Sequence, residues 1–148
     1  MDWSGVDLVR RMPELRDLSE DHHHGLVLAR NAKRAAVGEG DLSIDEVWDD
    51  IETKFETELE PHFQIEETFI GSVLETRDAS QFARRLYAEH IALREFLVPG
   101  HSRTTTELRN FGELLEQHIR FEEREFFEIA QELLTPDELR AVASACHK

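Results

Sequence analysis

The sequence contains little cysteine, glycine and proline, and it has no long hydrophobic run. Its single cysteine, Cys146, excludes an internal disulfide and any metal cluster built from cysteine thiolates. No apolar stretch approaches the roughly 18 residues of a membrane-spanning helix, and no segment resembles a signal peptide. We therefore expect a cytoplasmic protein without a membrane partner. Seven glycines and four prolines provide few turn signals, which favours long helices.

The chain is also poor in positive charge. It has 17 Lys and Arg against 32 Asp and Glu, so its formal net charge is -15 and its pI is about 4.9. Such a field repels the phosphates of nucleic acid, so we expect no nucleic-acid partner, whereas it attracts cations. A length of 148 residues predicts one domain, residues 1–148, with a sizeable core.

Start and stop signals divide the chain into helices. Ser19 is a good N-cap for a first helix that runs to Val37, and Pro13 is expected to interrupt any earlier helix. Gly38 or Gly40 is expected to end this first helix. Later helices are expected to begin at the Ser43–Glu46 capping box, at Asp78 or Ser80, at Thr104 and at Thr135, and Pro99–Gly100 is expected to close the third.

No segment has the pattern of a β-strand. Four long amphipathic segments with short connections predict an all-α protein, an antiparallel up-down-up-down four-helix bundle. The bundle core is expected over about residues 18–134, followed by a short C-terminal fifth helix at about 136–146. A short N-terminal arm is expected to carry the apolar residues Trp3, Val6, Leu8 and Val9.

Two of the helical segments carry a regular stripe at steps of three and four residues. The stripe of the second helix is Ile44, Trp48, Ile51, Phe55, Leu59, His62, Glu66, Phe69 and Val73. The stripe of the fourth helix is Phe111, Leu115, His118, Glu122, Phe126, Ile129 and Leu133. A regular α-helix places each stripe on one face, which predicts that all these residues are directed into the bundle. Pro61 lacks an N–H and is expected to kink the second helix.

Both stripes contain the same motif, Leu-Glu-x-His-apolar-x-apolar-Glu-Glu-x-x-apolar. Its His and first Glu are His62 and Glu66 in one copy, and His118 and Glu122 in the other. A step of four residues returns to the same helix face, so an imidazole and a carboxylate can bind one metal ion together. A surface ion pair has the same spacing, but these residues interrupt apolar stripes, where a carboxylate without a cation is costly to bury. We therefore predict that all four are metal ligands.

Single histidines on the other two helices complete the predicted site. His90 is the only polar residue on the stripe of the third helix. On the first helix the direction of the stripe favours His22, while the spacing to Leu26 keeps His23 as an alternative. The other candidate groups are expected to lie outside the site: Glu67 and Glu123 as solvated surface charges, His101 and His147 as bystanders, Cys146 as a plain thiol, and Tyr87 as a bundle residue whose hydroxyl finds a partner.

The predicted ligand set is four imidazoles and two carboxylates, without thiolate. These ligand types suit iron or manganese, and zinc is compatible with them. Two carboxylates can bridge two metal ions while the imidazoles terminate them. Ferritin-like bundles use Glu-x-x-His, whereas here the His comes first and the step is four.

The ordered pattern His22, His62-xxx-Glu66, His90, His118-xxx-Glu122 resembles the hemerythrin-like family, the HHE cation-binding domains. The resemblance covers about residues 18–134 and implies an antiparallel four-helix bundle with a non-heme di-iron centre, oxo- or hydroxo-bridged. It implies that Glu66 and Glu122 bridge the irons and that the four histidines are terminal ligands.

Two positions depart from the oxygen-carrying members of the family. Their third helix has a second His four residues after the first, where this chain has Arg94. Their fourth helix has an Asp five residues after its His, where this chain has Glu123. One imidazole fewer implies more open coordination positions, which favours family members linked to O2 or NO response, peroxide chemistry or iron handling.

The sequence thus gives three functional hypotheses. The first is a di-iron protein that binds or reacts with O2, NO or peroxide, in stress response or iron homeostasis. The second is an iron-binding or sensing protein without turnover, and the third is a metal-free structural bundle whose polar stripe serves partner specificity. The residues identify no catalytic acid or base apart from Tyr87, which could donate a proton, so enzymatic turnover stays open, as does a homo-oligomeric state.

Overall fold

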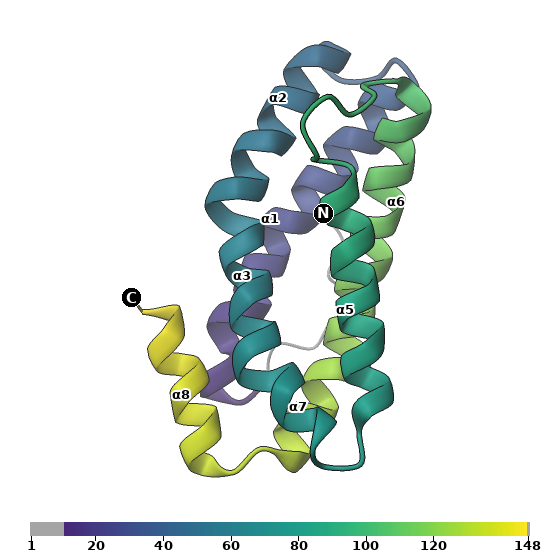
Figure 1. The fold of residues 1–148 in the computed structure, drawn as a ribbon. Helices are drawn as coiled ribbons and strands as arrows, with labels where there is room; N and C mark the ends of the chain where they lie inside the picture. Colours follow the sequence, from purple (N-terminus) through teal and green to yellow (C-terminus); the bar gives the residue numbers. More distant parts are fainter. Residues whose placement is uncertain (1–10, 148) are drawn as a thin grey trace.

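The computed structural model describes residues 11–147, and these residues form helices without a β-strand. Four helical rods make the bundle, and a shorter helix follows them (Figure 1). The first rod is α1 (Pro13–Ala36) and the third is α5 (Ser80–Glu95). The second rod comprises α2 (Ile44–Lys54), η2 (Phe55–Leu59), α3 (Glu60–Ile65), η3 (Glu66–Gly71) and α4 (Ser72–Glu75). The fourth rod comprises α6 (Thr105–Phe121), η4 (Glu122–Phe126) and α7 (Phe127–Leu133).

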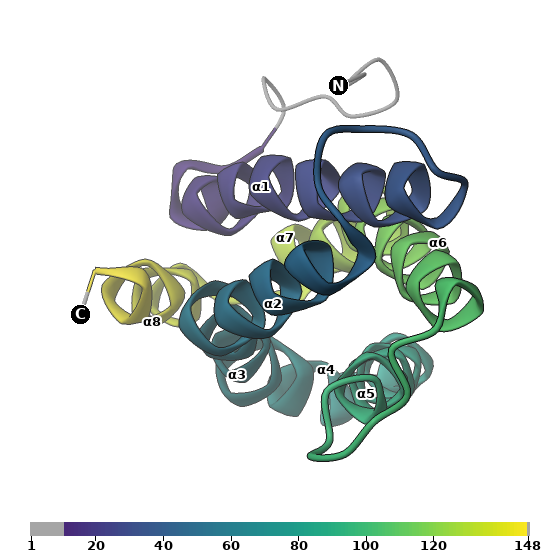
Figure 2. The same cartoon turned by 90° about the horizontal axis from the view of Figure 1, so that it is seen from above.

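The four rods run in alternating directions, because successive connections lie at opposite ends of the bundle (Figure 1). Seen from above, α1 lies beside the second rod and α6, and α5 closes the square on the far side (Figure 2). The last helix, α8 (Pro136–Cys146), lies outside the square against α1 and α3. The up-down-up-down bundle predicted from the sequence is confirmed. The expected N-terminal arm lies outside the described residues.

Several predicted helix ends are confirmed by their hydrogen bonds. Ser43 and Thr135 form complete capping boxes with Glu46 and Glu138, and the Thr104 side chain accepts a hydrogen bond from the Glu107 N–H. These caps satisfy backbone N–H groups that the first helical turn leaves without partners.

Two other predicted ends are wrong. The first helix begins at Pro13, which occupies the first turn where a missing N–H costs nothing. Ser19 therefore lies inside the helix rather than at its start, and its side chain is fully buried. The third helix ends at Glu95, before Pro99–Gly100.

The second and fourth rods change their helical pitch at the repeated motif. Glu66 begins the π-helical segment η3 and Glu122 begins the π-helical segment η4. The Phe127 N–H accordingly donates to the Glu122 carbonyl, five residues earlier. A π-turn holds one residue more than an α-turn, and such segments occur often at functional sites. A third π-helical segment, η2, ends at Leu59, shortly before Pro61 in the second rod.

These π-helical segments rotate the rest of each rod. After η3 begins, the fully buried residues are Ile70 and Leu74, whereas the predicted Phe69 and Val73 are only partly buried. The fourth rod shows the same shift of one residue, since Phe127, Ala130 and Leu134 are buried and Ile129 and Leu133 only partly. The prediction of one unbroken stripe along each helix is therefore wrong beyond the motif.

The apolar core consists of two clusters with a polar layer between them. One cluster surrounds Trp48, Ile51 and Phe111 near the α1–α2 connection, and the other surrounds Leu18 and Phe126 near the α4–α5 connection. Apart from Arg11, which precedes α1, the buried polar residues come from all four rods. Among the described residues, no helix combines the length and apolarity needed to cross a membrane.

Candidate metal centre

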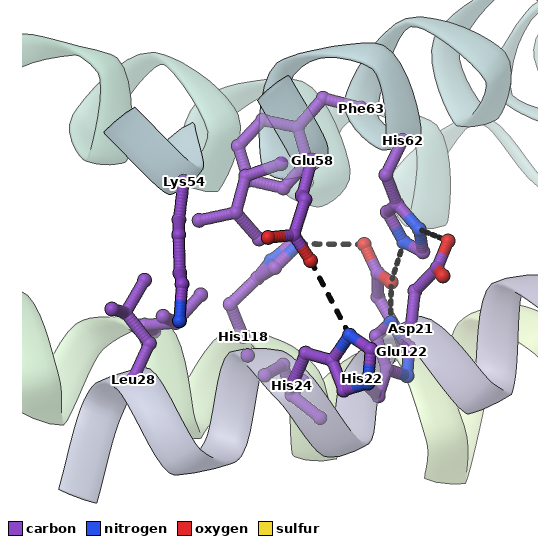
Figure 3. Close-up of a pocket in the computed structure, with 14 residues that line it drawn as sticks. Asp21, His22, His24, Leu28, Lys54, Glu58, His62, Phe63, His118 and Glu122 are labelled. Atoms are coloured by element: carbon purple, nitrogen blue, oxygen red, sulfur yellow. Dashed lines mark hydrogen bonds and ion pairs between the residues drawn. The ribbon is translucent and has the colours of Figure 1, made fainter. Parts of the chain in front are cut away.

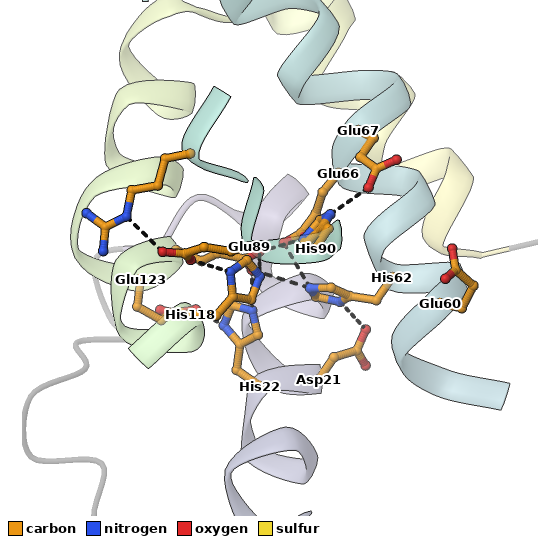
Figure 4. A network of polar contacts seen from close by, with 12 residues as sticks. Asp21, His22, Glu60, His62, Glu66, Glu67, Glu89, His90, His118 and Glu123 are labelled. Carbon is orange, nitrogen blue, oxygen red and sulfur yellow. Dashed lines mark hydrogen bonds and ion pairs between the residues drawn. The ribbon is translucent and has the colours of Figure 1, made fainter. Parts of the chain in front are cut away.

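The polar layer contains all six residues predicted as metal ligands. Figure 4 labels His22, His62, Glu66, His90 and His118. The exposed fractions of all six residues lie between 0% and 4%: His22, His62, Glu66, His90, His118 and Glu122. They form two groups whose ligand atoms lie within 4.8 Å of one another. The first metal position comprises His22 and His62 with Glu66 and Glu122, and the second comprises His90 and His118 with the same two glutamates.

Both glutamates contact histidines of both positions. A Glu66 carboxylate oxygen lies 2.9 Å from Nε2 of His62, and its other oxygen lies 3.2 Å from Nε2 of His90. Glu122 likewise places one oxygen 2.6 Å from Nε2 of His22 and the other 2.6 Å from Nε2 of His118. Each carboxylate therefore has the geometry to bridge two metal ions.

The imidazole nitrogens and carboxylate oxygens of this layer are better arranged to bind a metal ion than to form hydrogen bonds with one another. Four of them are buried and make no well-oriented hydrogen bond, although they lie close to one another: Oε1 of Glu66, Nε2 of His90, Nε2 of His118 and Oε2 of Glu122. These atoms belong to the four residues of the second metal position. Buried polar atoms without partners are costly, and a metal ion bound by these nitrogens and oxygens would satisfy them. The buried His and Glu clusters are thus suited to a metal site.

A second layer of four carboxylates surrounds the histidines; we call them the outer carboxylates. Nδ1 of His22 lies 2.6 Å from Glu123, and Nδ1 of His90 lies 2.6 Å from Glu67. Nδ1 of His118 lies 2.7 Å from Glu89, and Nδ1 of His62 lies 3.1 Å from Asp21 (Figure 4). A carboxylate on Nδ1 fixes the tautomer that presents Nε2 as ligand, which is the usual outer arrangement at metal-bound histidines.

The sequence was compared with known protein families, with curated proteins and with solved structures. The Hemerythrin HHE cation binding domain matches residues 14–130. The chain belongs to this family. No curated protein and no solved structure matches the chain significantly. For this hemerythrin-domain protein, membership supports a cation-binding bundle and leaves the identity of the cation to the proposal below.

The outer carboxylates correct one sequence-based interpretation. Glu67 and Glu123 were expected to be solvated surface charges, because they follow the bridging glutamates on a regular helix. Instead Glu123 is buried, and Glu67 is only partly exposed and holds His90. The sequence carried a signal for this role, since the acid is doubled in both copies of the motif. Acids also directly precede His22 and His90, at Asp21 and Glu89.

Three of the outer carboxylates are held in turn by arginines. Arg11 lies 3.2 Å from Glu123, and Ser19 donates to the same carboxylate at 2.7 Å. In the hemerythrin domain's other half, Arg94 lies 2.9 Å from Glu67, and Arg85 donates to Glu89 at 2.9 Å.

Asp21 differs from the other outer carboxylates. Its side chain is 58% exposed, and no described arginine contacts it. His62 therefore has the outer carboxylate with the least support.

Each of these arginines also lies over a phenylalanine near the histidine concerned. Phe63 stacks on His90 with ring centroids 3.8 Å apart, and Arg94 lies 5.6 Å from the centroid of Phe63. Phe127 stacks on His22, and Arg11 lies over Phe127 in the same way. Such cation–π contacts favour a fixed guanidinium. The arginine, the carboxylate and the phenylalanine together restrict the rotation of the imidazole.

The departure at Arg94 now has a structural explanation. Its guanidinium donates two hydrogen bonds of 2.8 Å to Glu60 and pairs with Glu67, and it belongs to neither group of candidate ligands. Arg94 therefore acts on the centre through Glu67 and His90.

The pKa shifts follow from burial and from these carboxylates. Burial favours the neutral imidazole of His22, but hydrogen bonds to Glu122 and Glu123 outweigh it and raise its pKa to about 9. For His90, Glu122, Glu66 and Glu67 outweigh burial and raise the pKa to about 10. Burial likewise opposes ionisation of Glu122, but His118 and the other neighbours hold its pKa well below the usual value. Without metal these groups pair as ions, so metal binding displaces protons from the imidazoles.

The remaining candidate groups lie away from the ligand groups. His23 is exposed, so the structure places His22 rather than His23 in the centre. His101 stacks on Trp48 and pairs with Glu52, and His147 pairs with Asp17.

Tyr87 and Cys146 also lie outside the ligand groups. Burial raises the pKa of the Tyr87 hydroxyl, and the nearby acids Glu75 and Glu67 raise it further. Burial raises the pKa of the half-buried Cys146 thiol to about 11, which disfavours the nucleophilic thiolate at neutral pH.

A narrow cavity joins the first metal position to the surface (Figure 3). His22, His62, His118 and Glu122 lie at its inner end, and His24, Lys54 and Glu58 lie at its outer end. The volume of about 20 Å³ holds roughly one water molecule. A molecule of that size can therefore approach the centre between α1, the second rod and α6.

Proposed function

We propose that this protein is a non-heme di-iron protein that binds or reacts with O2, NO or peroxide. The observation that carries the proposal is the sharing of Glu66 and Glu122 by two complete sets of buried ligands. In this assignment the two glutamates bridge the irons, His22 and His62 terminate one iron, and His90 and His118 terminate the other. Nitrogen and oxygen ligands without thiolate suit iron, with manganese and zinc as chemical alternatives.

An iron pair bound here would supply redox electrons and open coordination positions for a small molecule. The protein's own contribution is orientation and exclusion of water. The outer carboxylates direct each Nε2 inward and increase the basicity of the imidazoles. Phe63, which stacks on His90 and is 1% exposed, keeps solvent from the second position.

A second candidate is iron binding for storage, delivery or sensing without turnover. The position of Tyr87 favours it, because Tyr87 lies near Glu75 and belongs to neither ligand group. Tyr87 is thus poorly placed to be the proton donor of a catalytic cycle. The metal-free structural bundle remains as the third reading, in which the histidines and glutamates serve only as buried ion pairs.

The deciding experiment measures metal content and absorption. Protein purified from iron-supplemented cells should contain about two irons per chain and show near-ultraviolet bands that bleach on reduction with dithionite. His118→Ala should lose this stoichiometric binding. The matched control is His101→Ala, since His101 is also buried and paired with a glutamate but lies outside the centre.

The outcomes separate the three candidates. Iron binding with consumption of peroxide or NO supports the first, and stable iron binding without consumption supports the second. A well-folded chain that takes up no iron under anaerobic conditions, and whose stability is indifferent to chelators, supports the metal-free bundle. Two irons retained in His118→Ala would show that the ligand assignment is wrong.

A further inference from the structure

Gly25, which has no side chain, forms part of the wall of the cavity in Figure 3. We infer that this cavity is the access channel to the centre, that Gly25, Leu59 and Ile119 form its neck, and that it admits small neutral molecules. The inference rests on the proposed function, because it assumes that a small molecule reaches the metal positions. It adds which residues select that molecule and on what property.

Gly25 occupies an unfavourable place for a glycine. It lies in the middle of α1, where glycine in place of alanine costs roughly 0.5–1 kcal/mol of stability. A Cβ at this position would lie 2.8 Å from Cδ1 of Ile119 and 4.0 Å from Cδ2 of Leu59. Both atoms belong to residues that line the cavity, so a methyl group at position 25 would displace the Ile119 side chain that now lies against the glycine.

Close packing of α1 on α6 does not explain this glycine. At Gly112 a Cβ would lie 2.8 Å from the backbone oxygen of Ala29, an atom that cannot move without shifting α1. At Gly25 the obstacle is the end of a flexible side chain, which can rotate. Alanine at position 25 would therefore leave the helix packing in place and move the Ile119 side chain, which would narrow the neck.

The chemistry of the walls indicates the kind of molecule. Leu28, Leu59, Phe63, Leu115 and Ile119 make the passage largely apolar. An ion would lose its hydration in such a passage without gaining a partner. At the inner end an anion would also meet Glu122, in a chain of net charge -15. These features favour a neutral diatomic molecule over an anion or a bulky oxidant.

The outer end carries polar side chains that leave the mouth accessible. Nδ1 of His24 lies 3.3 Å from the Glu58 carboxylate, across the gap between α1 and η2 (Figure 3). Both side chains are exposed, at 69% and 44%, so the ion pair is weak and can open.

The first test uses the kinetics of NO binding to the ferrous protein, followed by stopped-flow absorption. A neck controls passage in both directions, so it changes the association and dissociation rates by the same factor and leaves the Kd unchanged. Gly25→Ala should therefore slow both rates several-fold, and Leu59→Ala should accelerate both. Leu114→Ala is the matched control, because Leu114 packs on the same core but does not line the cavity.

The second test is independent of iron. Xenon occupies small apolar cavities, so xenon-saturated buffer should shift the amide NMR signals of Gly25 and Ile119 in protein as purified and after zinc loading. Gly25→Ala should abolish the shifts, and Leu114→Ala should retain them.

The results distinguish failure of the channel from failure of the proposed function. Unchanged NO rates in Gly25→Ala, or a changed Kd with an unchanged association rate, would overturn the channel while iron binding stands. A chain that binds neither iron nor NO would overturn the proposed function, and the access role with it. Xenon shifts confined to other parts of the bundle would show that the neck is closed.

Discussion

The two candidate metal positions have the same types of ligand, two histidines and the two shared glutamates, but they have different surroundings. Each position combines an acid–His pair on one helix with a His-xxx-Glu-Glu motif on the next. Asp21–His22 and the His62 motif supply the two histidines of the first position, and Glu89–His90 and the His118 motif supply those of the second, while Glu66 and Glu122 belong to both. The second Glu of each motif crosses to the other position, since Glu67 holds His90 and Glu123 holds His22.

The outer carboxylates do not repeat as closely as the ligands do between the two positions. Both outer carboxylates of the second position are held by arginines, Arg94 and Arg85. In the first position Glu123 is held by Arg11 and Ser19, but Asp21 is largely exposed. The cavity also opens beside the first position. The two groups of candidate ligands therefore differ in how firmly their outer carboxylates are held and in how close they lie to the cavity.

The largest effect should come from a ligand that both positions share. Glu122→Ala should reduce iron content from about two per chain to below one, because each metal loses a carboxylate. His90→Ala should leave about one, since only the second position loses a ligand. Metal analysis after gel filtration measures both. Glu116→Ala, a glutamate of α6 that pairs with Lys33, is the control and should keep two irons. Equal losses in the first two variants would contradict the sharing.

A smaller effect should follow when the support of His90 is removed. Arg94→Ala leaves Glu67 without its guanidinium, so we expect metal affinity at the second position to fall about 10–100-fold. Competition with a chelator measures the affinity. Arg94→Lys should restore part of it through charge alone, and Arg120→Ala, which breaks only an exposed pair with Glu116, should have no effect. If Arg94→Ala bound metal with normal affinity, Phe63 and Glu67 would be sufficient to orient His90 without the guanidinium.

The exposed carboxylate should matter less. Asp21→Asn keeps an oxygen acceptor for Nδ1 of His62 and removes a charge that solvent already screens. We expect a loss of affinity at the first position below the range of about 10–100-fold that is typical for outer carboxylates. The same chelator competition applies, with Glu67→Gln as the matched change at the second position. A larger loss of metal affinity in Asp21→Asn than in Glu67→Gln would show that the exposed carboxylate matters more than the one held by arginine.

The smallest effect concerns α8, which packs on the helices that carry His22 and His62. Arg77 donates two hydrogen bonds of 2.6 Å to Glu138, and these lower the pKa of Glu138 to about 2. Because the pKa of Glu138 is lower in the folded than in the unfolded protein, its ionised form stabilises the folded protein at pH values above the unfolded pKa of 4.5. This stabilisation is lost as the pH falls towards 2.

The test compares acid unfolding of wild type and Glu138→Gln by circular dichroism. The variant should be less stable at neutral pH, and the difference should shrink between pH 4.5 and 2. Arg140→Gln, which removes only an exposed pair with Asp137, is the control and should follow the wild-type curve. A difference that grows on acidification would contradict the assigned pKa direction.

The sequence by itself determined the bundle and the six candidate ligands. Helical periodicity and side-chain caps are local properties, so the stripes, the Ser43 and Thr135 capping boxes and the repeated His-xxx-Glu spacing could be read without coordinates. The cost of burying a carboxylate distinguished Glu66 and Glu122 from ordinary surface acids.

Only the tertiary structure decided the surroundings of those ligands. The π-helical segments at Glu66 and Glu122 depend on what the rods pack against, so a regular period of 3.6 residues misplaced Phe69 and Ile129. The pairing of Glu67 with His90 and of Glu123 with His22 joins residues far apart in the chain. The neck at Gly25 likewise exists only because α1, the second rod and α6 meet there. Local spacing specifies which residues can bind a metal, whereas contacts between rods determine how each residue is held and reached.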